Sequence, residues 1–391
     1  MLGEVMGLLS RMARENQPQL VRRIYDKAKE YEGVVDLTLG DPDVPTPCVA
    51  KEAACRALEE NRTKYTANAG ILPLREAICA DVEKRLGVTY SPDEVCVTTG
   101  AMGALYLAAV CLLDPGDEMI IPEPHWPNYT NMVAMCHAVP KYVNFLEAGD
   151  PLALARRIEA AVTPKTKAII LNSPSNPTGA VLPFETLEAV AQIAKKYDLW
   201  VFSDEVYHTI VFEGACRSIL EIPDMKCRTV YIDSVSKRFS MTGFRVGYLC
   251  APQPLAASAA ALQENVNACA CTPAQYASLA ALRHSDELEE EICAVFRQRC
   301  RAMARELNRS ATLSVEMPVA TFYLFIDVRK TGLSSEDFAY GLLEEKHVAV
   351  VPGNAFNRAG EGYIRIACTL EEETLVAAAR AIVDFADRRC R

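Results

Sequence analysis

Short runs of apolar residues alternate with longer amphipathic segments along the first two thirds of the chain. The runs lie at residues 95–100, 118–123, 141–145, 168–172, 199–204, 228–233 and 245–251. Between them, apolar residues recur with helical spacing, as at Leu74, Ile78, Val82 and Leu86. Because the short runs are almost entirely apolar, they are typical of strands that crossover helices bury on both faces. The pattern predicts an α/β fold with a large, mostly parallel sheet sandwiched by helices.

The pattern changes near residue 273. Residues 273–308 form a long, charged segment with helical spacing, which we expect to connect two domains. Apolar runs within 314–328 and 348–367, with helical segments at 334–345 and 370–389, predict a smaller α+β domain. A chain of 391 residues also exceeds the roughly 250–300 residues that one core supports. We therefore expect an N-terminal segment (1–40) that packs with the small domain and is helical over Leu9–Tyr31, a large domain (41–275), and an interdomain helix with the small C-terminal domain (276–391).

Polar residues follow several predicted strands, at the edge where an open α/β sheet binds its ligands. Gly100, Ala101 and Met102 follow the first run and open a helix, so their backbone N–H groups could bind a phosphate. Glycine before a helix is also common in plain turns. Asn176 follows the fourth run in a proline-rich segment that could equally be an ordinary turn. Asp204 ends the fifth run, where a carboxylate either caps the next turn or keeps a heteroaromatic nitrogen protonated.

Lys237 lies in the segment SVSKRFSMTGFRVGY (234–248), in a predicted loop between two buried strands. An ammonium group there is costly to desolvate unless it has a partner or a chemical role, such as bonding to an aldehyde. A solvated surface lysine is the alternative. Lys237, Asp204, Tyr207 and the phosphate-binding loop together supply an amine, an anion for a ring nitrogen, a donor for a phenolate oxygen and a phosphate anchor. Pyridoxal phosphate requires these four parts, so their joint placement predicts that cofactor.

Along almost its whole length the sequence resembles the class I, aspartate aminotransferase-like family of the fold-type I pyridoxal-phosphate enzymes. The motif S-x-x-K, followed eight residues later by arginine, is similar to the lysine segment of that family. The resemblance implies that Lys237 is the catalytic residue, which bonds covalently to the cofactor and acts as general base and acid. The other cofactor-binding residues that it implies are Ser234, Arg245, Gly100, Ala101 and Met102 at the phosphate, Asp204 at the ring nitrogen, Tyr207 and Asn176 at the phenolate oxygen, and Trp126 on the ring face.

Three further segments resemble the same family. KYTANAGILPLREAI carries Tyr65, which would reach the cofactor phosphate of a neighbouring subunit and so implies a homodimer. LTLGDPDVPTP carries Gly40, and GYIRIACT carries Arg365, both expected at the substrate together with Trp126 and Asn176. Arg365 would bind the substrate α-carboxylate, a two-pronged task that suits guanidinium better than ammonium.

The resemblance implies an aminotransferase that moves an amino group between an L-amino acid and a 2-oxo acid by ping-pong chemistry, with aspartate-type or broad specificity. A β-lyase that cleaves C–S bonds has the same fold and most of the same residues, although Trp126 favours the aminotransferase branch. A non-catalytic regulatory module is disfavoured by the complete catalytic set. One prokaryotic subgroup binds the distal carboxylate of a dicarboxylic substrate with a lysine where this chain has Met102. Arg22 or Arg23 in the N-terminal segment could take the place of that lysine here.

Composition narrows the partners to small molecules. A net charge of −10 argues against nucleic acid and against an anionic membrane surface. The 15 cysteines include no C-x-x-C pair and the five histidines are scattered, so we expect no metal site. No stretch approaches 18 consecutive apolar residues. The odd number of cysteines, many of them within apolar runs, and the lack of a recognisable signal peptide lead us to expect a reducing cytoplasm.

Overall fold

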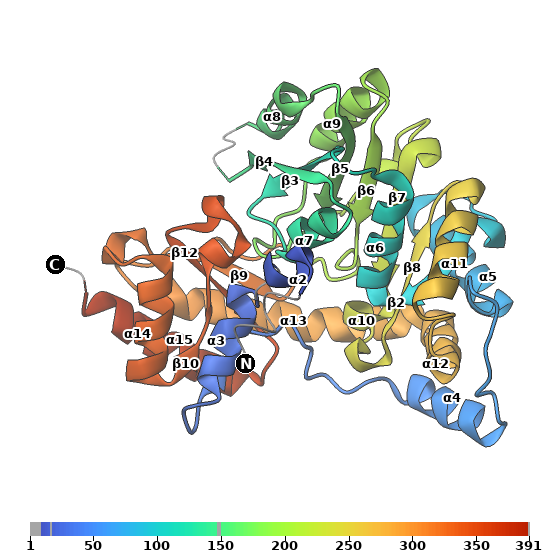
Figure 1. Ribbon diagram of the computed structural model, residues 1–391. Helices are drawn as coiled ribbons and strands as arrows, with labels where there is room; N and C mark the ends of the chain where they lie inside the picture. The colour runs from blue at the N-terminus through green and yellow to red at the C-terminus, as the bar shows by residue number, and fades with distance from the viewer. Residues whose placement is uncertain (1–8, 16–17, 147–149, 390–391) are drawn as a thin grey trace.

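A computed structural model describes residues 9–15, 18–146 and 150–389 of the chain. Its largest element is a seven-stranded sheet (Figure 1). In spatial order its strands are β2 (Val95–Thr99), β8 (Val246–Cys250), β7 (Thr229–Ser234), β6 (Trp200–Asp204), β5 (Thr166–Asn172), β3 (Glu118–Glu123) and β4 (Val139–Asn144). Only β8 runs against its neighbours in this sheet. The predicted large, mostly parallel sheet is therefore confirmed.

Helices cover both faces of this sheet. They are α4 (Cys48–Glu59), α5 (Leu72–Leu86), α6 (Gly100–Leu112), α7 (Asn128–Met135), α8 (Ala153–Ala161), α9 (Phe184–Lys196), α10 (Val235–Arg238), α11 (Gln253–Val266) and α12 (Thr272–Arg283). Successive strand residues point to opposite faces. Ala168 and Ile170 of β5 pack in the core with α6, α7 and α11, whereas Ile169 and Leu171 pack with α8 and α9. Helices α5 and α12 cover the β2, β7 and β8 end of that second face.

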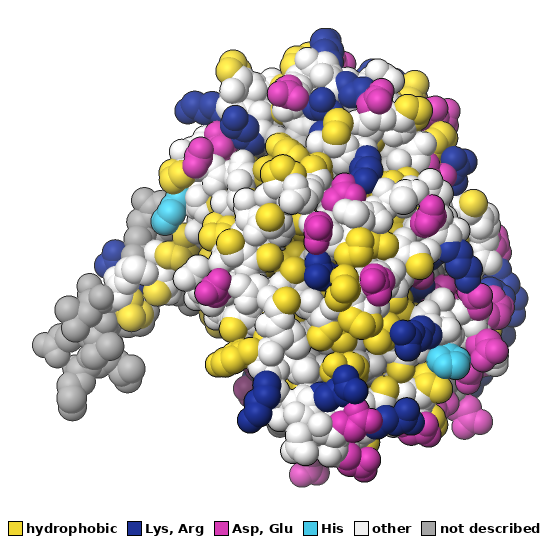
Figure 2. Space-filling model, turned by 90° about the vertical axis from the view of Figure 1, so that its right-hand side faces the viewer, with side chains coloured by type: hydrophobic (Ala, Val, Ile, Leu, Met, Phe, Trp, Pro, Cys, Tyr) yellow, Lys and Arg dark blue, Asp and Glu magenta, His cyan; other side chains and the backbone are white. Residues whose placement is uncertain are grey.

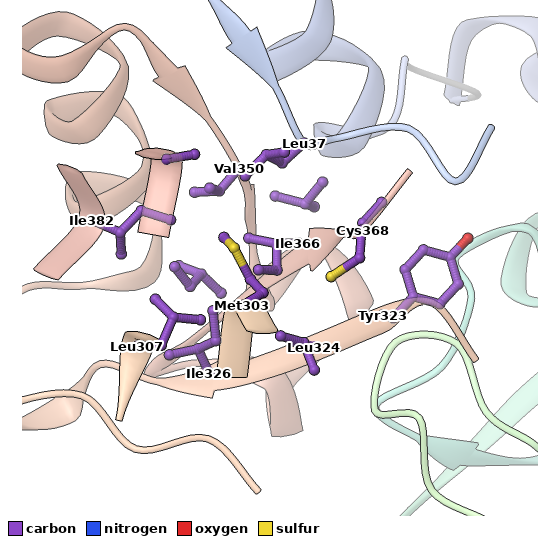
Figure 3. Close-up of a cluster of buried hydrophobic side chains, with 14 of the residues drawn as sticks. Leu37, Met303, Leu307, Tyr323, Leu324, Ile326, Val350, Ile366, Cys368 and Ile382 are labelled. Atoms are coloured by element: carbon purple, nitrogen blue, oxygen red, sulfur yellow. The ribbon is translucent and has the colours of Figure 1, made fainter. Parts of the chain in front are cut away.

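A smaller lobe is built on an antiparallel sheet of β11 (Val351–Pro352), β12 (Tyr363–Ala367) and β9 (Tyr323–Asp327). Its helices are α13 (Ser285–Leu307), α14 (Ser335–Lys346) and α15 (Glu372–Asp387). Figure 3 shows its core, in which Met303 and Leu307 of α13 lie against the strand residues Ile326 and Ile366. In Figure 1, α13 runs from this lobe to a position below the large sheet.

The N-terminal segment joins the small lobe. It contains α2 (Arg11–Glu15), α3 (Leu20–Ala28) and β1 (Val35–Asp36), and β1 pairs in parallel with β10 (Val348–Ala349). Ile24, Ala28 and Leu37 are buried in the core of that lobe. The domain boundaries themselves stay a prediction.

Two local predictions differ from the structure. The single helix predicted over Leu9–Tyr31 is interrupted: Pro18 and Gln19 are not helical between the described helices α2 and α3, and residues 16 and 17 lie outside the described residues. The predicted loop around Lys237 is a one-turn helix, α10, because the Ser234 hydroxyl accepts a hydrogen bond from the Ser236 backbone N–H at 3.0 Å and caps the turn. None of the described helices is long and apolar enough to cross a membrane.

Candidate active site

A cavity of about 260 Å³ lies where the carboxyl ends of β5, β6 and β7 face the small lobe. Asn172 of β5 lies in register with Asp204 of β6, which explains why residues far apart in the sequence meet here. The predicted residues that line the cavity are Gly40, Ala101, Met102, Trp126, Asn176, Asp204, Tyr207, Ser234, Lys237, Arg245 and Arg365. The structure therefore brings together in one chain all the predicted site residues except Gly100 and Tyr65.

Asp204 is the buried carboxylate of the cavity, with only 2% of its surface exposed. Its Oδ2 accepts a hydrogen bond from the Tyr129 hydroxyl at 2.6 Å, and its Oδ1 accepts a long one from the Val206 N–H at 3.4 Å. Burial raises the pKa of Asp204 to about 7, against the opposing effect of the Tyr129 hydroxyl. In the described chain no lysine or arginine forms an ion pair with Asp204, so the site leaves this anion without a cationic partner.

Lys237 extends from α10 across the cavity to the small lobe. Its ammonium donates a hydrogen bond to the Gly40 carbonyl and lies 5.9 Å from the centre of the Phe322 ring. Burial lowers the pKa of Lys237 to about 8; Asp41 acts against this shift, and Arg245 and Arg365 add to it. A lysine with a depressed pKa is a better nucleophile and base near neutral pH than a solvated one.

Three structural features converge on one end of the cavity and suit a phosphate. The N-terminus of the 13-residue helix α6 presents the backbone of Ala101 and Met102. The Ser234 and Ser236 hydroxyls lie 2.7 Å apart beside it. Arg245, held by a hydrogen bond of 2.9 Å to the Thr242 carbonyl, completes the group.

Glycine is required at two positions around this end. A Cβ on Gly100, whose φ is +70°, would lie 2.5 Å from the Arg245 guanidinium, and one on Gly247 would lie 2.3 Å from the Ala101 backbone nitrogen. Gly100 therefore lies against the Arg245 guanidinium, although it does not line the cavity. Both glycines let the Arg245 side chain and strand β8 come close to the start of α6.

Arg365 lies on β12 at the other end of the cavity and is 3% exposed. Its guanidinium donates to the Asn176 side-chain oxygen at 3.1 Å and to the Thr38 carbonyl, and lies 4.5 Å from the centre of the Tyr323 ring. Its Nε is buried without a hydrogen-bond partner in the described chain. Burial lowers the pKa of Arg365, since no carboxylate of the described residues pairs with it. A carboxylate ligand would satisfy this arginine.

Tyr65 is the predicted site residue that lies apart from the cavity. It is 87% exposed and does not line the cavity of its own chain.

The cavity is also lined by Tyr129, Asn172 and Tyr323, which the sequence did not predict. The Asn172 side chain donates to the Asp204 backbone carbonyl at 3.0 Å, and the Tyr323 hydroxyl lies 3.1 Å from that of Tyr207. Only Asn172 carried a sequence signal, because it ends a predicted strand; the tyrosines reach the site from a helix and from the other lobe.

Comparison with known proteins identifies the family. The family model for "Aminotransferase class I and II" matches residues 32–382. The chain belongs to the class I and II aminotransferases. The putative aminotransferase YugH of Bacillus subtilis is 40% identical over 368 residues, which cover 94% of this chain and 95% of the relative. The aromatic-amino-acid aminotransferase 2 of Thermococcus litoralis is 36% identical over 95% of this chain and 96% of its own.

Solved structures agree with this assignment. The aspartate aminotransferase from Thermus thermophilus with maleate superposes with a TM-score of 0.90 at 35% identity, covering 96% of this chain and 99% of that one. The fold is therefore the fold-type I transferase that the sequence predicted, and the protein is an aminotransferase, as expected. The β-lyase and the regulatory module find no support among these relatives.

The residues of this aminotransferase fit the pyridoxal phosphate that the family uses. Asp204 is a buried anion that pairs with no cation of the described residues, which suits a protonated ring nitrogen. Lys237 is a buried amine with a lowered pKa, and the α6 N-terminus with Arg245 suits a phosphate. Each part of the cofactor therefore has a group of matching charge in the cavity.

Proposed function

We propose that this aminotransferase binds pyridoxal phosphate in the cavity and transfers amino groups from L-amino acids to 2-oxo acids there. The observation that carries the proposal is that Asp204 is buried and forms no ion pair with a described residue, in the same cavity as Lys237 and the α6 N-terminus. When bound, the cofactor would supply an aldehyde for the amino group and a ring that accepts electrons from the substrate Cα. The roles that we assign are Lys237 to the aldehyde, Asp204 to the ring nitrogen, Tyr207 and Asn176 to the phenolate oxygen, Trp126 to the ring face, and Ser234, Arg245, Gly100, Ala101 and Met102 to the phosphate.

In this proposal Lys237 moves the proton. Its Nζ would take the proton from the substrate Cα and deliver it to the carbon of the bound cofactor that had carried the aldehyde. A pKa of about 8 keeps a usable fraction of the amine neutral near neutral pH. Burial of the site excludes water, so the electrostatic effects of Asp204 and Arg365 on the reacting groups are stronger than in solution.

Replacing Lys237 tests the proposal directly. Purified Lys237→Ala should lose the visible absorbance of the lysine-bound cofactor and should lose transamination. Lys330→Ala, a substitution on the exposed surface of the small lobe, is the control and should keep both. If Lys237→Ala retained both properties, the assignment of the cavity would be wrong.

We further propose that Arg365 binds the substrate α-carboxylate beside Gly40 and that the side-chain specificity is broad and does not depend on a second carboxylate. Among the described residues, the cationic side chains that line the cavity are Lys237, Arg245 and Arg365, which already have roles. Arg22 forms an ion pair of 3.0 Å with Asp26 on the exposed side of α3, and Arg23 is exposed too. Neither supports recognition of a distal carboxylate.

The remaining lining groups near Trp126 favour apolar substrate side chains. Met102, Val21 and Leu39 line the cavity with Trp126. The relatives include one named for aromatic amino acids and a solved structure named for aspartate, so the family itself does not decide between these classes. A panel of donors should therefore give a kcat/KM for phenylalanine, leucine or methionine at least equal to that for aspartate. A strong preference for aspartate would contradict the broad specificity.

A homodimer is the assembly that we infer. Figure 2 looks onto the side of the molecule that carries α4, α5, α11 and α12, where hydrophobic side chains lie scattered among charged ones. Leu58, Tyr65, Leu72 and Val266, from these helices and their connections, are among the most exposed large apolar residues. Their exposure supports contact with a second copy, to which Tyr65 would reach. The described cysteines are all free thiols, which supports a reducing cytoplasmic location.

A further inference from the structure

A group of buried charged residues lies behind α10, on the opposite side from the cavity. We call it the Arg238 cluster and define it as Asp81, Arg85, Asp233, Arg238 and Glu289. Asp81 and Arg85 come from α5, Asp233 from β7, Arg238 from α10 and Glu289 from α13. The side chains of Arg238, Asp233 and Asp81 are 2%, 3% and 6% exposed. The proposed chemistry uses none of these residues.

Arg238 is the centre of this cluster and is the residue directly after Lys237. Its Nη1 and Nη2 donate to the two oxygens of Asp81 at 2.7 and 2.5 Å, as a two-pronged pair. Its Nε donates to Glu289 at 2.6 Å. Every nitrogen of the guanidinium is thus bound to a carboxylate, and α10 is tied to both α5 and α13.

Asp233 holds the other end of the same turn. Its Oδ1 accepts the backbone N–H of Ser234 at 2.7 Å. Its Oδ2 accepts from Tyr248 at 2.9 Å, Arg85 at 3.0 Å and Tyr231 at 3.1 Å. Since Arg85 also binds Asp81, at 2.8 Å, the start and the end of α10 are held by one connected network.

A four-residue helix has little stability of its own, because forming the first helical turn is unfavourable. The orientation of Lys237 therefore depends on what holds α10. The side-chain contacts of Lys237 itself, with Gly40 and Phe322, lie at the far end of its flexible chain. The cluster instead fixes the backbone from which that chain starts.

We propose that Arg238 and Asp81 are positioning residues for Lys237: their ion pair fixes α10 so that the Lys237 amine meets the reacting atoms. The proposal rests on the assignment of Lys237 made above. The charges that act on the Lys237 ammonium are those of Asp41, Arg245 and Arg365, from the cavity side. Arg238 acts through the position of the backbone.

The test compares Arg238→Met and Arg238→Lys with the wild-type holoenzyme. A displacement of about 1 Å at a reacting group can lower a rate about 100-fold, so kcat of Arg238→Met should fall by about that factor. KM should change little, because Arg365 is not touched. The circular dichroism of the bound cofactor in the visible range, per cofactor bound, should fall as well, since it reports the orientation of the group attached to Lys237.

Arg238→Lys keeps the charge and loses the two-pronged geometry. Its kcat should therefore be roughly tenfold higher than that of Arg238→Met and still below that of the wild type. Arg299→Met is the matched control for the loss of a buried arginine ion pair, because Arg299 is 7% exposed and binds Asp43 at 2.5 Å. It should lower the melting temperature and leave kcat and the dichroism unchanged.

A purely structural role would give a different result. Arg238→Met would then melt earlier but keep wild-type kcat and dichroism below its transition, and that outcome overturns the proposal. If Arg238→Met does not fold, Glu289→Gln removes only one partner of Arg238 and should show the same two changes to a smaller extent; unchanged values overturn the proposal too. A wild-type protein without a lysine-bound cofactor band would instead refute the assignment of Lys237 itself.

Discussion

Two groups of buried charged residues lie on opposite sides of the segment around Lys237, and they differ in how completely they are paired. In the Arg238 cluster, Asp81 accepts hydrogen bonds from two arginines, which hold the pKa of its carboxyl well below the usual range. In the cavity, Asp204 is buried to a similar degree, yet its pKa is raised to about 7 because no cation of the described chain compensates for burial.

The buried arginines show the same contrast. Arg238 binds carboxylates with all three nitrogens, and they raise its pKa further above the ordinary value. Arg365 binds a neutral amide and a carbonyl, its Nε has no hydrogen-bond partner among the described residues, and its pKa is lowered. A buried charge that lacks a partner costs free energy.

The difference indicates where this protein binds charged ligands. The charges of the Arg238 cluster pair with one another and stabilise the fold. Both Asp204 and Arg365 line the cavity, and among the described residues neither has a partner of opposite charge; a cationic ring and a carboxylate would pair with them. Buried charges without a partner of opposite charge therefore mark the binding site, and buried charges that pair with one another mark its support.

The largest expected effect comes from Asp204→Asn. The substitution removes the only buried anion that we assign to the ring nitrogen, and loss of such a preorganised charge costs about 1000-fold in rate. We expect kcat to fall by about that factor while far-UV circular dichroism stays unchanged. A loss of less than about tenfold would contradict the assigned role.

Asp204→Asn should lower kcat, yet it should make the cofactor-free protein more stable near neutral pH. The pKa of Asp204 in the folded, cofactor-free chain, about 7, is higher than the ordinary 3.8, so the folded state binds the proton more tightly. The free energy of unfolding should then fall as pH rises from about 4 to 7, by up to about 4 kcal/mol. Asp204→Asn should remove this fall, which chemical denaturation of the cofactor-free protein across this pH range would measure.

Asp81→Asn is the matched comparison within the Arg238 cluster. Its carboxylate has a lowered pKa, so it contributes stability above about pH 4 that is lost as pH falls further. Removing one member of a buried pair leaves two arginines short of a partner and should cost about 3–5 kcal/mol at pH 7. If Asp81→Asn and Asp204→Asn had the same effect on stability, the distinction between the two groups would fail.

The sequence predicted most of this site, for physical reasons that also explain its gaps. Asp204, Asn176 and Ser234 follow apolar strands, and the carboxyl ends of parallel strands meet at one edge, so their meeting was foreseeable. Tyr129 and Tyr323 come from a helix and from the other lobe, and no local pattern indicates where such residues point. The Arg238 cluster was missed for the same reason: Asp81 and Glu289 are 208 positions apart and look like ordinary charged residues of amphipathic helices.

Arg365→Lys should have an intermediate effect. Lysine keeps the positive charge but cannot make a two-pronged contact with a carboxylate, and a hydrogen bond between charged groups contributes enough for a loss of about 10- to 100-fold. We expect KM for the amino donor to rise by that factor while kcat changes much less. Arg299→Lys, at a buried ion pair of 2.5 Å between Arg299 and Asp43, controls for the general effect of the exchange. A fall confined to kcat would argue against carboxylate binding.

Tyr129→Phe should have the smallest effect on kcat. It tests whether the pKa of Asp204 is set by burial against its one strong hydrogen bond. The Tyr129 hydroxyl donates to Asp204 at 2.6 Å and opposes the rise of its pKa, so the substitution should raise that pKa further. In the cofactor-free protein, the fall in unfolding free energy should then extend to higher pH, and kcat should drop about three- to tenfold. If Tyr129 acts only through Asp204, Tyr129→Phe should add almost nothing in the Asp204→Asn background. Additive effects would mean that the Tyr129 hydroxyl contributes independently of Asp204.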